Sequence, residues 1–331
     1  MRRAHTADKR GFVVPAEHND VQRLNPSAPP NAMSVDVEDY FQTESMSQAV
    51  PRENWEGMSS RVERNTQRLF DLFAAHGVRG TFFFLGWVAE RFPGLVKQAA
   101  SRGHEVACHS YWHRPVFRLT PEEFREDTLR AKGIIEDTAG TAVRGYRAPS
   151  FSITPGKEWA ADILAELGFW YDSSVHPIRH DFYDNHNAPR LPYHMQGKPL
   201  LEIPIATLRL AANNFPMAGG GYFRALPYPC VRWGIRRFNR LEQRPAVFYI
   251  HPWEIDPEQP RIAAKTKSVA RQYAGLATTW NKLDRLCADF RFVPMVEAFR
   301  DELPIAPTVP AAESAQSDPE RDRQAGVKSC G

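Results

Sequence analysis

The chain has 331 residues, of which 42% are hydrophobic and 24% charged, values typical of a globular protein. Its 42 Lys and Arg against 39 Asp and Glu leave a formal net charge of +3, which is too small to indicate a nucleic-acid-binding surface. We expect no membrane-spanning helix, because no run of about 18 apolar residues occurs. The first twenty residues lack the apolar segment of a secretory signal, so we expect a cytoplasmic protein, either free or at the inner face of the membrane.

The two ends of the chain differ in composition from its centre. Residues 1–30 and 304–331 are rich in Pro, Ala, Ser and charged residues and have few periodic apolar positions, so we predict that both are disordered. Residues 31–303 then form a single folded domain. The four cysteines, Cys108, Cys230, Cys287 and Cys330, have no CxxC spacing, and we expect free thiols.

Short apolar runs alternate with longer amphipathic stretches along residues 31–303. The runs that predict strands are 33–37, 80–85, 105–109, 143–148, 169–173, 200–205, 246–251 and 290–294. The stretches that predict helices are 60–76, 93–102, 121–138, 157–167, 228–239 and 263–288. Thr120 before Pro121 is typical of a helix start, and Gly103 and Gly140 are typical of helix ends.

This alternation of strands and helices indicates a parallel sheet covered by helices. A closed or nearly closed (β/α) barrel is our first expectation, and a doubly wound open sheet is the alternative. In both folds the chemistry is expected at the carboxyl ends of the strands.

Three carboxylates, Asp36, Glu38 and Asp39, lie at the end of the first predicted strand. Carboxylates this close together raise one another's pKa or bind a cation, so the cluster indicates a metal site or an acid/base pair. A solvated acidic turn would give the same pattern. If the strand stays extended, Asp36 and Glu38 lie on one face and Asp39 on the other, whereas a turn after Val37 could present Asp39 instead.

Two histidines, His109 and His113, follow the third predicted strand. They would lie on the same side if the segment began a helical turn, and both could then bind one divalent ion. A pair of histidines on a helix surface is the alternative for this spacing alone. Two histidines with one carboxylate are a ligand set of hydrolytic zinc sites, which favours a metal.

Three further strands end in ionisable residues: Arg147, Asp172 and His251. Taken singly, Arg147 could form a surface ion pair and His251 could be a core histidine. Five of the predicted strands nevertheless place ionisable side chains at one edge of the sheet, which indicates an active site.

These segments resemble the motifs of the polysaccharide deacetylases, carbohydrate esterase family 4. The matching segments, in chain order, are SVDVEDYF, HSYWH, RAPS, YDSS and the YIH of FYIHPWE, and the resemblance covers about residues 33–300. The DVEDYFQ and FPMAGGGYFR segments also resemble a branch associated with exopolysaccharide loci of bacteria that carry an exosortase system. One departure from the commonest pattern is Val37, which stands where that pattern has a second adjacent aspartate.

The resemblance implies a deformed (β/α) barrel of about seven to eight parallel strands that removes N-acetyl groups from N-acetylhexosamine units of a polysaccharide. It implies one divalent ion, for which we expect Zn²⁺, held by His109, His113 and either Glu38 or Asp39. The resemblance also implies that Asp36 is the base, that His251 is the acid and that Arg147 is the partner of the base. It implies that the backbone N–H of Ser150 binds the oxyanion and that Asp172 orients His251 or Arg147.

Aromatic residues next to these motifs could stack on sugar rings, although core packing is an equal alternative. We name Tyr111, Trp112 and Trp253 as candidate substrate contacts. The glycines Gly219–Gly221 suggest a flexible lip over the substrate groove or a plain turn. Two other functions stay open: hydrolysis of another non-peptide amide on the same scaffold, and a catalytically silent carbohydrate-binding protein.

Overall fold

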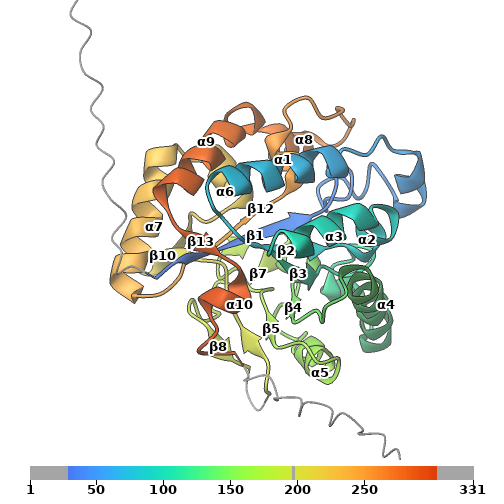
Figure 1. Cartoon of the computed structure of the whole chain (residues 1–331), viewed down its shortest axis with the longest axis horizontal. Coiled ribbons are helices and arrows are strands. Elements are labelled where there is room, and N and C mark those ends of the chain that lie inside the picture. The colour runs from blue at the N-terminus through green and yellow to red at the C-terminus, as the bar shows by residue number, and fades with distance from the viewer. Residues whose placement is uncertain (1–28, 196–197, 304–331) are drawn as a thin grey trace, which may run out of the picture.

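The computed structural model describes residues 29–195 and 198–303. Apart from residues 29–30, both ends that we predicted to be disordered lie outside the described residues. One sheet dominates the fold (Figure 1). Its strands are β1 (Asn31–Val37), β2 (Thr81–Phe84), β3 (Glu105–Cys108), β4 (Gly145–Tyr146), β5 (Tyr171–Asp172), β8 (Tyr193–His194), β9 (Leu201–Glu202), β12 (Val247–Ile250) and β13 (Phe292–Val293).

The strand order is that of a barrel rather than of a doubly wound sheet. The strands run β12-β1-β2-β3-β4-β5-β9-β8. Chain order is kept around the sheet except at β8, which lies beyond β9 and is the one described strand of this sheet that is antiparallel to its neighbour. Between β9 and β12 the wall is irregular: Ala206 N donates to Val247 O at 3.2 Å, and Gly219 forms an isolated bridge with Tyr249. The sheet is therefore a deformed (β/α) barrel, as predicted, and all eight predicted strands form.

Helices cover the outside of this sheet (Figure 1). They are α1 (Val62–Ala75), α2 (Gly86–Arg91), α3 (Pro93–Ser101), α4 (Pro121–Ala139), α5 (Trp159–Glu166), α6 (Gly220–Ala225), α7 (Tyr228–Glu242), α8 (Thr266–Tyr273), α9 (Leu276–Asp289) and α10 (Met295–Ala298). The predicted boundary of α4 is confirmed, because Thr120 and Glu123 form a reciprocal capping box and Gly140 ends the helix at φ 67°. No helix among the described residues is long and apolar enough to cross a membrane.

The predicted helix 263–288 is wrong in one respect, because it is two helices. Gly275 lies between α8 and α9 at φ 78°, and a Cβ there would lie 2.6 Å from the Arg224 carbonyl oxygen. The Arg224 side chain donates to the carbonyl oxygens of Gln272 and Ala274 at the end of α8. A side chain from α6, distant in sequence, therefore satisfies the carbonyls that a continuous helix would have used.

Small elements between residues 175 and 225 were not predicted. They are β8, α6 and two hairpins, β6 (Arg179–His180) with β7 (Tyr183–Asp184) and β10 (Thr207–Leu210) with β11 (Asn213–Pro216). Strands this short carry too little alternation to be recognised. The cysteines in the described residues, Cys108, Cys230 and Cys287, are free as expected, and Cys330 lies outside them.

Candidate metal centre and active site

Glu38, His109 and His113 form a compact cluster at the carboxyl ends of β1 and β3. Their ligand atoms all lie within 4.8 Å of one another, and all three residues are buried. His113 Nε2 is 2.7 Å from Glu38 Oε2. Two imidazoles and a carboxylate at this spacing match the donor set and size of a divalent-cation site.

The local backbone differs from the helical turn that we considered for His109 and His113. Ser110 and His113 have φ values of 65° and 52°, and the Ser110 hydroxyl accepts a hydrogen bond from the His113 N–H at 3.1 Å. The Asp127 carboxylate on α4 accepts bonds from the N–H groups of Tyr111 and Trp112. A tight turn held by α4 therefore brings the two imidazoles together.

Neighbouring groups prepare the cluster for a cation. His109 Nδ1 donates to the Arg147 carbonyl oxygen at 2.8 Å, which leaves Nε2 free to ligate. Burial lowers the pKa of His109 well below its ordinary value, which favours the neutral imidazole that a metal needs. Burial alone would raise the pKa of Glu38, but His113 and the other nearby histidines outweigh it and lower that pKa. The residues present therefore fit a divalent ion.

Asp39, which the sequence left open as a metal ligand, has a different role. Its Oδ2 accepts hydrogen bonds from the Ser60 hydroxyl and from the N–H groups of Arg61 and Val62, at 2.6, 2.8 and 3.1 Å. These donors lie at the amino end of α1, where a carboxylate is stabilised by the free N–H groups and the helix dipole. The chain turns after Val37 so that Glu38 faces the histidines and Asp39 caps α1.

Asp36 and Arg147 form a buried ion pair beside the cluster. Arg147 has no exposed surface, and its Nη1 lies 2.6 Å from Asp36 Oδ1. The same guanidinium donates to the Ser173 carbonyl oxygen and to the hydroxyls of Ser34 and Ser173. These bonds fix the orientation of the Asp36 carboxylate, as expected for a charge pair that is fully hydrogen-bonded.

His251 stands opposite Asp36 across the site. Its Nε2 is 3.9 Å from Asp36 Oδ2 and 3.6 Å from Glu38 Oε1. Its Nδ1 donates to Glu254 Oε2 at 2.9 Å. Burial would lower the pKa of His251, but the Glu254, Glu38 and Asp36 carboxylates outweigh it and raise the pKa to about 9.

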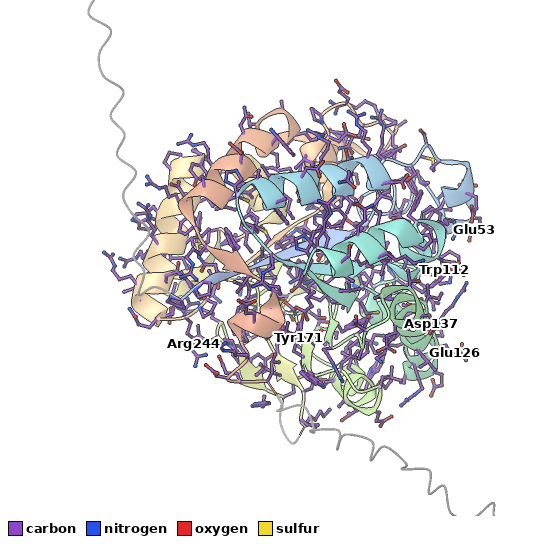
Figure 2. All side chains as sticks on the ribbon, in the orientation of Figure 1. Glu53, Trp112, Glu126, Asp137, Tyr171 and Arg244 are labelled. Carbon is purple, nitrogen blue, oxygen red and sulfur yellow. The ribbon has the colours of Figure 1, made fainter. Side chains whose placement is uncertain are left out.

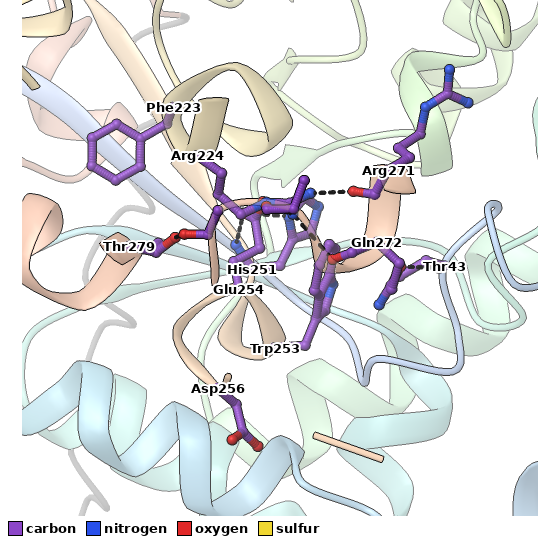
Figure 3. A network of polar contacts seen from close by, with 12 residues as sticks. Thr43, Phe223, Arg224, His251, Trp253, Glu254, Asp256, Arg271, Gln272 and Thr279 are labelled. Atoms are coloured by element: carbon purple, nitrogen blue, oxygen red, sulfur yellow. Dashed lines mark hydrogen bonds and ion pairs between the residues drawn. The ribbon is translucent and has the colours of Figure 1, made fainter. Parts of the chain in front are cut away.

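Glu254 is a site residue that the sequence reasoning missed. Its second oxygen accepts from Arg224 Nε at 2.7 Å, and Arg224 is held in turn by the last carbonyls of α8 (Figure 3). Trp253 stacks on His251 with ring centroids 5.3 Å apart and donates to Glu38 Oε1 at 3.0 Å. One signal in the sequence could have revealed Glu254. It lies three residues after His251 at the end of a strand, the spacing of a capping box.

Among the described residues, Asp172 forms no hydrogen bond or ion pair with His251 or Arg147, the residues that we expected it to orient. It accepts a hydrogen bond from the Ser174 hydroxyl, which accepts one from the Ala148 N–H at 2.7 Å. Its other neighbour is Glu202, its register partner on β9. The orienting contact to His251 comes from Glu254 instead, so the prediction for Asp172 is corrected in this respect.

Asp172 and Glu202 are both fully buried, and the pKa of each carboxyl group is raised. Burial raises the pKa of Asp172 to about 6, and burial with the neighbouring Asp172 raises the pKa of Glu202 well above its ordinary value. Among the described residues, Asp172 Oδ2 and Glu202 Oε2 have no hydrogen-bond partner, and we infer that the two carboxyl groups share one proton at neutral pH. A proton between these two oxygens satisfies both of them.

We expect the variant Glu202→Gln to become more stable relative to the parent as pH rises through about 6. An acid whose pKa is higher in the folded than in the unfolded protein stabilises the fold at pH values below its unfolded pKa. This contribution is lost as the pH rises through the pKa of the folded state. The amide that Glu202→Gln introduces would still accept the hydrogen bond from the Val175 N–H and would donate to Asp172 at every pH. The gain in the free energy of unfolding relative to the parent should reach at least about 1.4 kcal/mol, the equivalent of one pKa unit.

The measurement is the free energy of unfolding in denaturant between pH 5 and 8. Glu126→Gln, at an exposed acid on α4 (Figure 2), is the matched control and should show no such trend. A difference between Glu202→Gln and the parent that stayed constant across this range would exclude the shared proton.

A cavity of about 580 Å³ opens over these groups. Asp36, Glu38, His109, His113 and His251 all contribute to its wall, and Ser150, the predicted oxyanion residue, lines it with a φ of 55°. Its aromatic wall consists of Phe151, Phe182, Tyr183, Tyr222, Tyr249 and Trp253. Half of these come from the region 175–225, whose short elements the sequence did not reveal.

Two predicted substrate contacts do not line this cavity. Tyr111 is buried, and its hydroxyl donates to Glu90 and accepts from Arg130 on the far side of the HSYWH turn. Trp112 packs against Trp55 and lies at the edge of the molecule in Figure 2. The two predictions are wrong because the turn after His109 points these rings toward α2 and η1 (Arg52–Gly57) instead.

The glycines 219–221 form neither a lip nor a plain turn. They begin α6, and Gly219 lies so close to β12 that a Cβ would overlap the Tyr249 carbonyl oxygen. A Cβ on Gly220 would likewise overlap the Tyr249 hydroxyl. Glycine is required here because the backbone packs directly on the barrel wall.

Fold and site together define a (β/α)-barrel protein with a His₂-carboxylate cluster, fit for a divalent cation, at the carboxyl edge of its sheet. Residues 56–169 match the family described as polysaccharide deacetylase, and residues 173–300 match a domain of unknown function, DUF3473. Residues 56–169 of the chain therefore match the polysaccharide deacetylases, the family that the sequence motifs resemble. Asp36 and Glu38 precede the first match, and His251 lies within the second.

Curated relatives match about a third of the chain, and a solved structure shares its fold. The chain is 33% identical over 98 residues to a peptidoglycan-N-acetylglucosamine deacetylase of Bacillus cereus, covering 29% of this chain and 36% of the relative. It is 33% identical over 101 residues to a chitooligosaccharide deacetylase of Bradyrhizobium sp., covering 30% and 43%. The chain thus matches less than half of either relative. A candidate polysaccharide deacetylase from Mycobacterium smegmatis shares the fold, with a TM-score of 0.54, 20% identity and coverage of 83% and 91%.

Proposed function

We propose that this protein is a metal-dependent N-deacetylase that removes acetyl groups from N-acetylhexosamine units of a polysaccharide, with an exopolysaccharide as its substrate. The observation that carries the proposal is the convergence of a carboxylate, a cation cluster and a histidine on one cavity. Asp36 and His251 face each other at 3.9 Å, with Glu38 of the cluster 3.6 Å from His251. Amide hydrolysis needs a base, an acid and an electrophile in this arrangement.

The cation, which we propose to be Zn²⁺, supplies Lewis acidity that polarises the acetamide carbonyl and makes water more acidic. Asp36 accepts the proton of the attacking water, and its ion pair with Arg147 holds the carboxylate in one orientation. The Ser150 backbone N–H would stabilise the developing oxyanion, a role supported by its position in the cavity wall.

His251 donates the proton to the departing amine from Nε2, because Nδ1 is occupied with Glu254. The sugar rings would lie in the cavity against its aromatic wall, where Trp253 and Tyr222 offer apolar faces. Trp253 also holds Glu38 through its indole N–H, so this one residue supports both the cluster and the acid.

Acetate release tests the function directly. The purified protein is incubated with N-acetylglucosamine oligomers and with N-acetylated exopolysaccharides, with and without a chelator, and acetate is quantified. We expect release that the chelator stops and that added Zn²⁺ restores. Binding of these glycans without acetate release would identify a silent carbohydrate-binding protein, and release from other amides alone would identify a different hydrolase.

We expect His251→Ala to lower kcat by about 10²- to 10⁴-fold, the usual contribution of a positioned acid.

Glu254→Gln should lower kcat by about tenfold to a hundredfold with little change in KM, because a neutral amide cannot stabilise the imidazolium that donates the proton. Glu254→Asp, which keeps the charge, should recover part of the loss. A Glu254→Gln variant with parental kcat would show that Glu254 has only a structural role.

A further inference from the structure

A second, apolar groove lies on the β10–β11 side of the molecule, away from the catalytic residues. It encloses about 370 Å³ and is lined by Leu208, Leu210, Phe215, Met217, Leu226 and Trp233, among others. Three of these side chains are unusually exposed for their size: Leu210 at 38%, Phe215 at 40% and Trp233 at 52%. Large apolar groups gathered in this way mark an interaction surface rather than scattered surface residues.

The tip of the β10–β11 hairpin extends the apolar surface. Ala211 and Ala212 connect the two strands and are exposed, directly after Leu210. The tip therefore presents three consecutive apolar residues to solvent, beside Phe215 of β11. A hairpin tip is ordinarily polar, because turns favour Gly, Asn, Asp and Ser.

Helix α7 places positive charge beside this groove. Its buried stripe consists of Val231, Gly234, Ile235 and Phe238, whereas the opposite stripe carries Trp233, Arg236, Arg237 and Arg240 at the same helical spacing. The Arg237 guanidinium lies 5.7 Å from the centre of the Trp233 ring. An exposed tryptophan among arginines, next to an apolar groove, is typical of a surface that sits at a membrane interface.

The acidic groups near this face do not neutralise it. Glu242 is paired with Arg190 at 2.9 Å, and Asp289 is paired with Arg232 at 3.0 Å. Among the described residues, Arg236, Arg237 and Arg240 form no ion pair. The face therefore keeps a net positive charge around its apolar centre, which complements an anionic lipid surface.

We propose that the β10–β11 hairpin and the exposed stripe of α7 form a docking surface for an anionic lipid bilayer. Leu210, Phe215 and Trp233 enter the boundary between headgroups and acyl chains, and the arginines of α7 bind lipid phosphates. This proposal does not depend on the proposed deacetylase activity, because it concerns a separate surface.

The docking surface also has a defined relation to the catalytic cavity. Helix α6 separates them: Gly220 and Ala225 line the cavity, and Leu226, the next residue, lines the groove. Met217, from the segment that precedes α6, packs against Gly234 of α7, where a Cβ would meet the Met217 sulfur at 2.5 Å. Docking would therefore hold the cavity beside the bilayer, within reach of a glycan presented there.

Co-sedimentation of the full chain with vesicles tests the proposal without any substrate. Vesicles of equal parts phosphatidylglycerol and phosphatidylethanolamine are compared with vesicles of phosphatidylcholine alone. We expect binding to the anionic vesicles that weakens as salt is added, and at least about tenfold weaker binding to the neutral ones.

Four variants separate the two components of the surface from general effects. Trp233→Ser and Phe215→Ser should each weaken binding by about tenfold or more, through loss of an inserted apolar side chain. Arg236→Gln with Arg240→Gln should weaken it by about 25-fold, roughly fivefold for each charge. Leu129→Ser, at a side chain on α4 that is 54% exposed, is the matched control and should bind like the parent.

Three results would overturn the proposal. One is the absence of binding to anionic vesicles, and another is equal weakening by Leu129→Ser and by Trp233→Ser. The third is a finding by light scattering that the parent protein is a dimer and that Trp233→Ser converts it to a monomer. A second copy of the chain, rather than a bilayer, would then cover the groove. Since all substituted side chains are at least partly exposed, thermal unfolding should be close to that of the parent in each variant.

Discussion

Alanine in place of Glu38, His109 or His113 is expected to abolish binding of a divalent cation and, with it, the proposed deacetylase activity. Each substitution deletes one of the three donors that lie within 4.8 Å of one another. Loss of an outer-shell partner of a metal ligand typically costs about 10- to 100-fold in affinity, so loss of a ligand should cost more than about 100-fold. Elemental analysis and Zn²⁺ titration calorimetry on folded protein measure the effect.

Asp39→Asn is the matched control for this prediction, because Asp39 is adjacent to Glu38 but caps α1. It should retain the cation and lower the free energy of unfolding by about 0.5 to 2 kcal/mol, the usual effect of a lost helix cap. Parental cation content in either histidine variant, or an empty site in Asp39→Asn, would contradict the assignment of ligands.

Asp36→Asn is expected to lower kcat by about 10²- to 10⁴-fold while the cation is retained. The amide cannot accept the proton of the attacking water, but Asp36 is outside the cluster of cation ligands. Steady-state kinetics of acetate release, together with metal analysis on the same samples, separates the two properties. If Asp36→Asn instead emptied the cation site in a folded protein, the roles of Asp36 and Glu38 would have to be exchanged.

Removal of the Asp36 charge also leaves Arg147 buried without its anionic partner, which can destabilise a protein by about 3 to 5 kcal/mol. Asp36→Glu addresses this risk because it keeps the charge opposite Arg147 and only displaces the carboxylate. We expect it to fold like the parent and still to lose most of kcat, since a base must lie within hydrogen-bond reach of the water. Parental turnover in a folded Asp36→Glu protein would be evidence against Asp36 as the positioned base.

The barrel was predictable from sequence because its strands are buried on both faces. A strand such as β2, with the sequence TFFF, is almost wholly apolar, and runs of this kind between amphipathic helices are typical of a parallel sheet. The helix ends at Thr120 and Gly140 were predictable because capping depends on local geometry. In contrast, β6, β7 and β8 contain two residues each, too few to show a pattern in the sequence.

The residues of the site were largely predictable, but their partners were not. Parallel strands bring their carboxyl ends to one edge, which placed Asp36, His109, Arg147 and His251 together on sequence grounds alone. The choice between Glu38 and Asp39 needed the position of α1, because the amino end of that helix takes the Asp39 carboxylate. The turn that orients His113 likewise depends on Asp127 of α4.

The sequence by itself determined the fold class, the family resemblance and the edge of the sheet that carries the ionisable groups, since each follows from local periodicity or from motif order. Only the tertiary structure decided that Glu254 rather than Asp172 holds His251, that Arg224 ends α8 and fixes Glu254, and that Tyr111 belongs to the core. The physical reason is that these are contacts between side chains from elements far apart in the chain, and burial and hydrogen-bond satisfaction select among them only once the elements are packed.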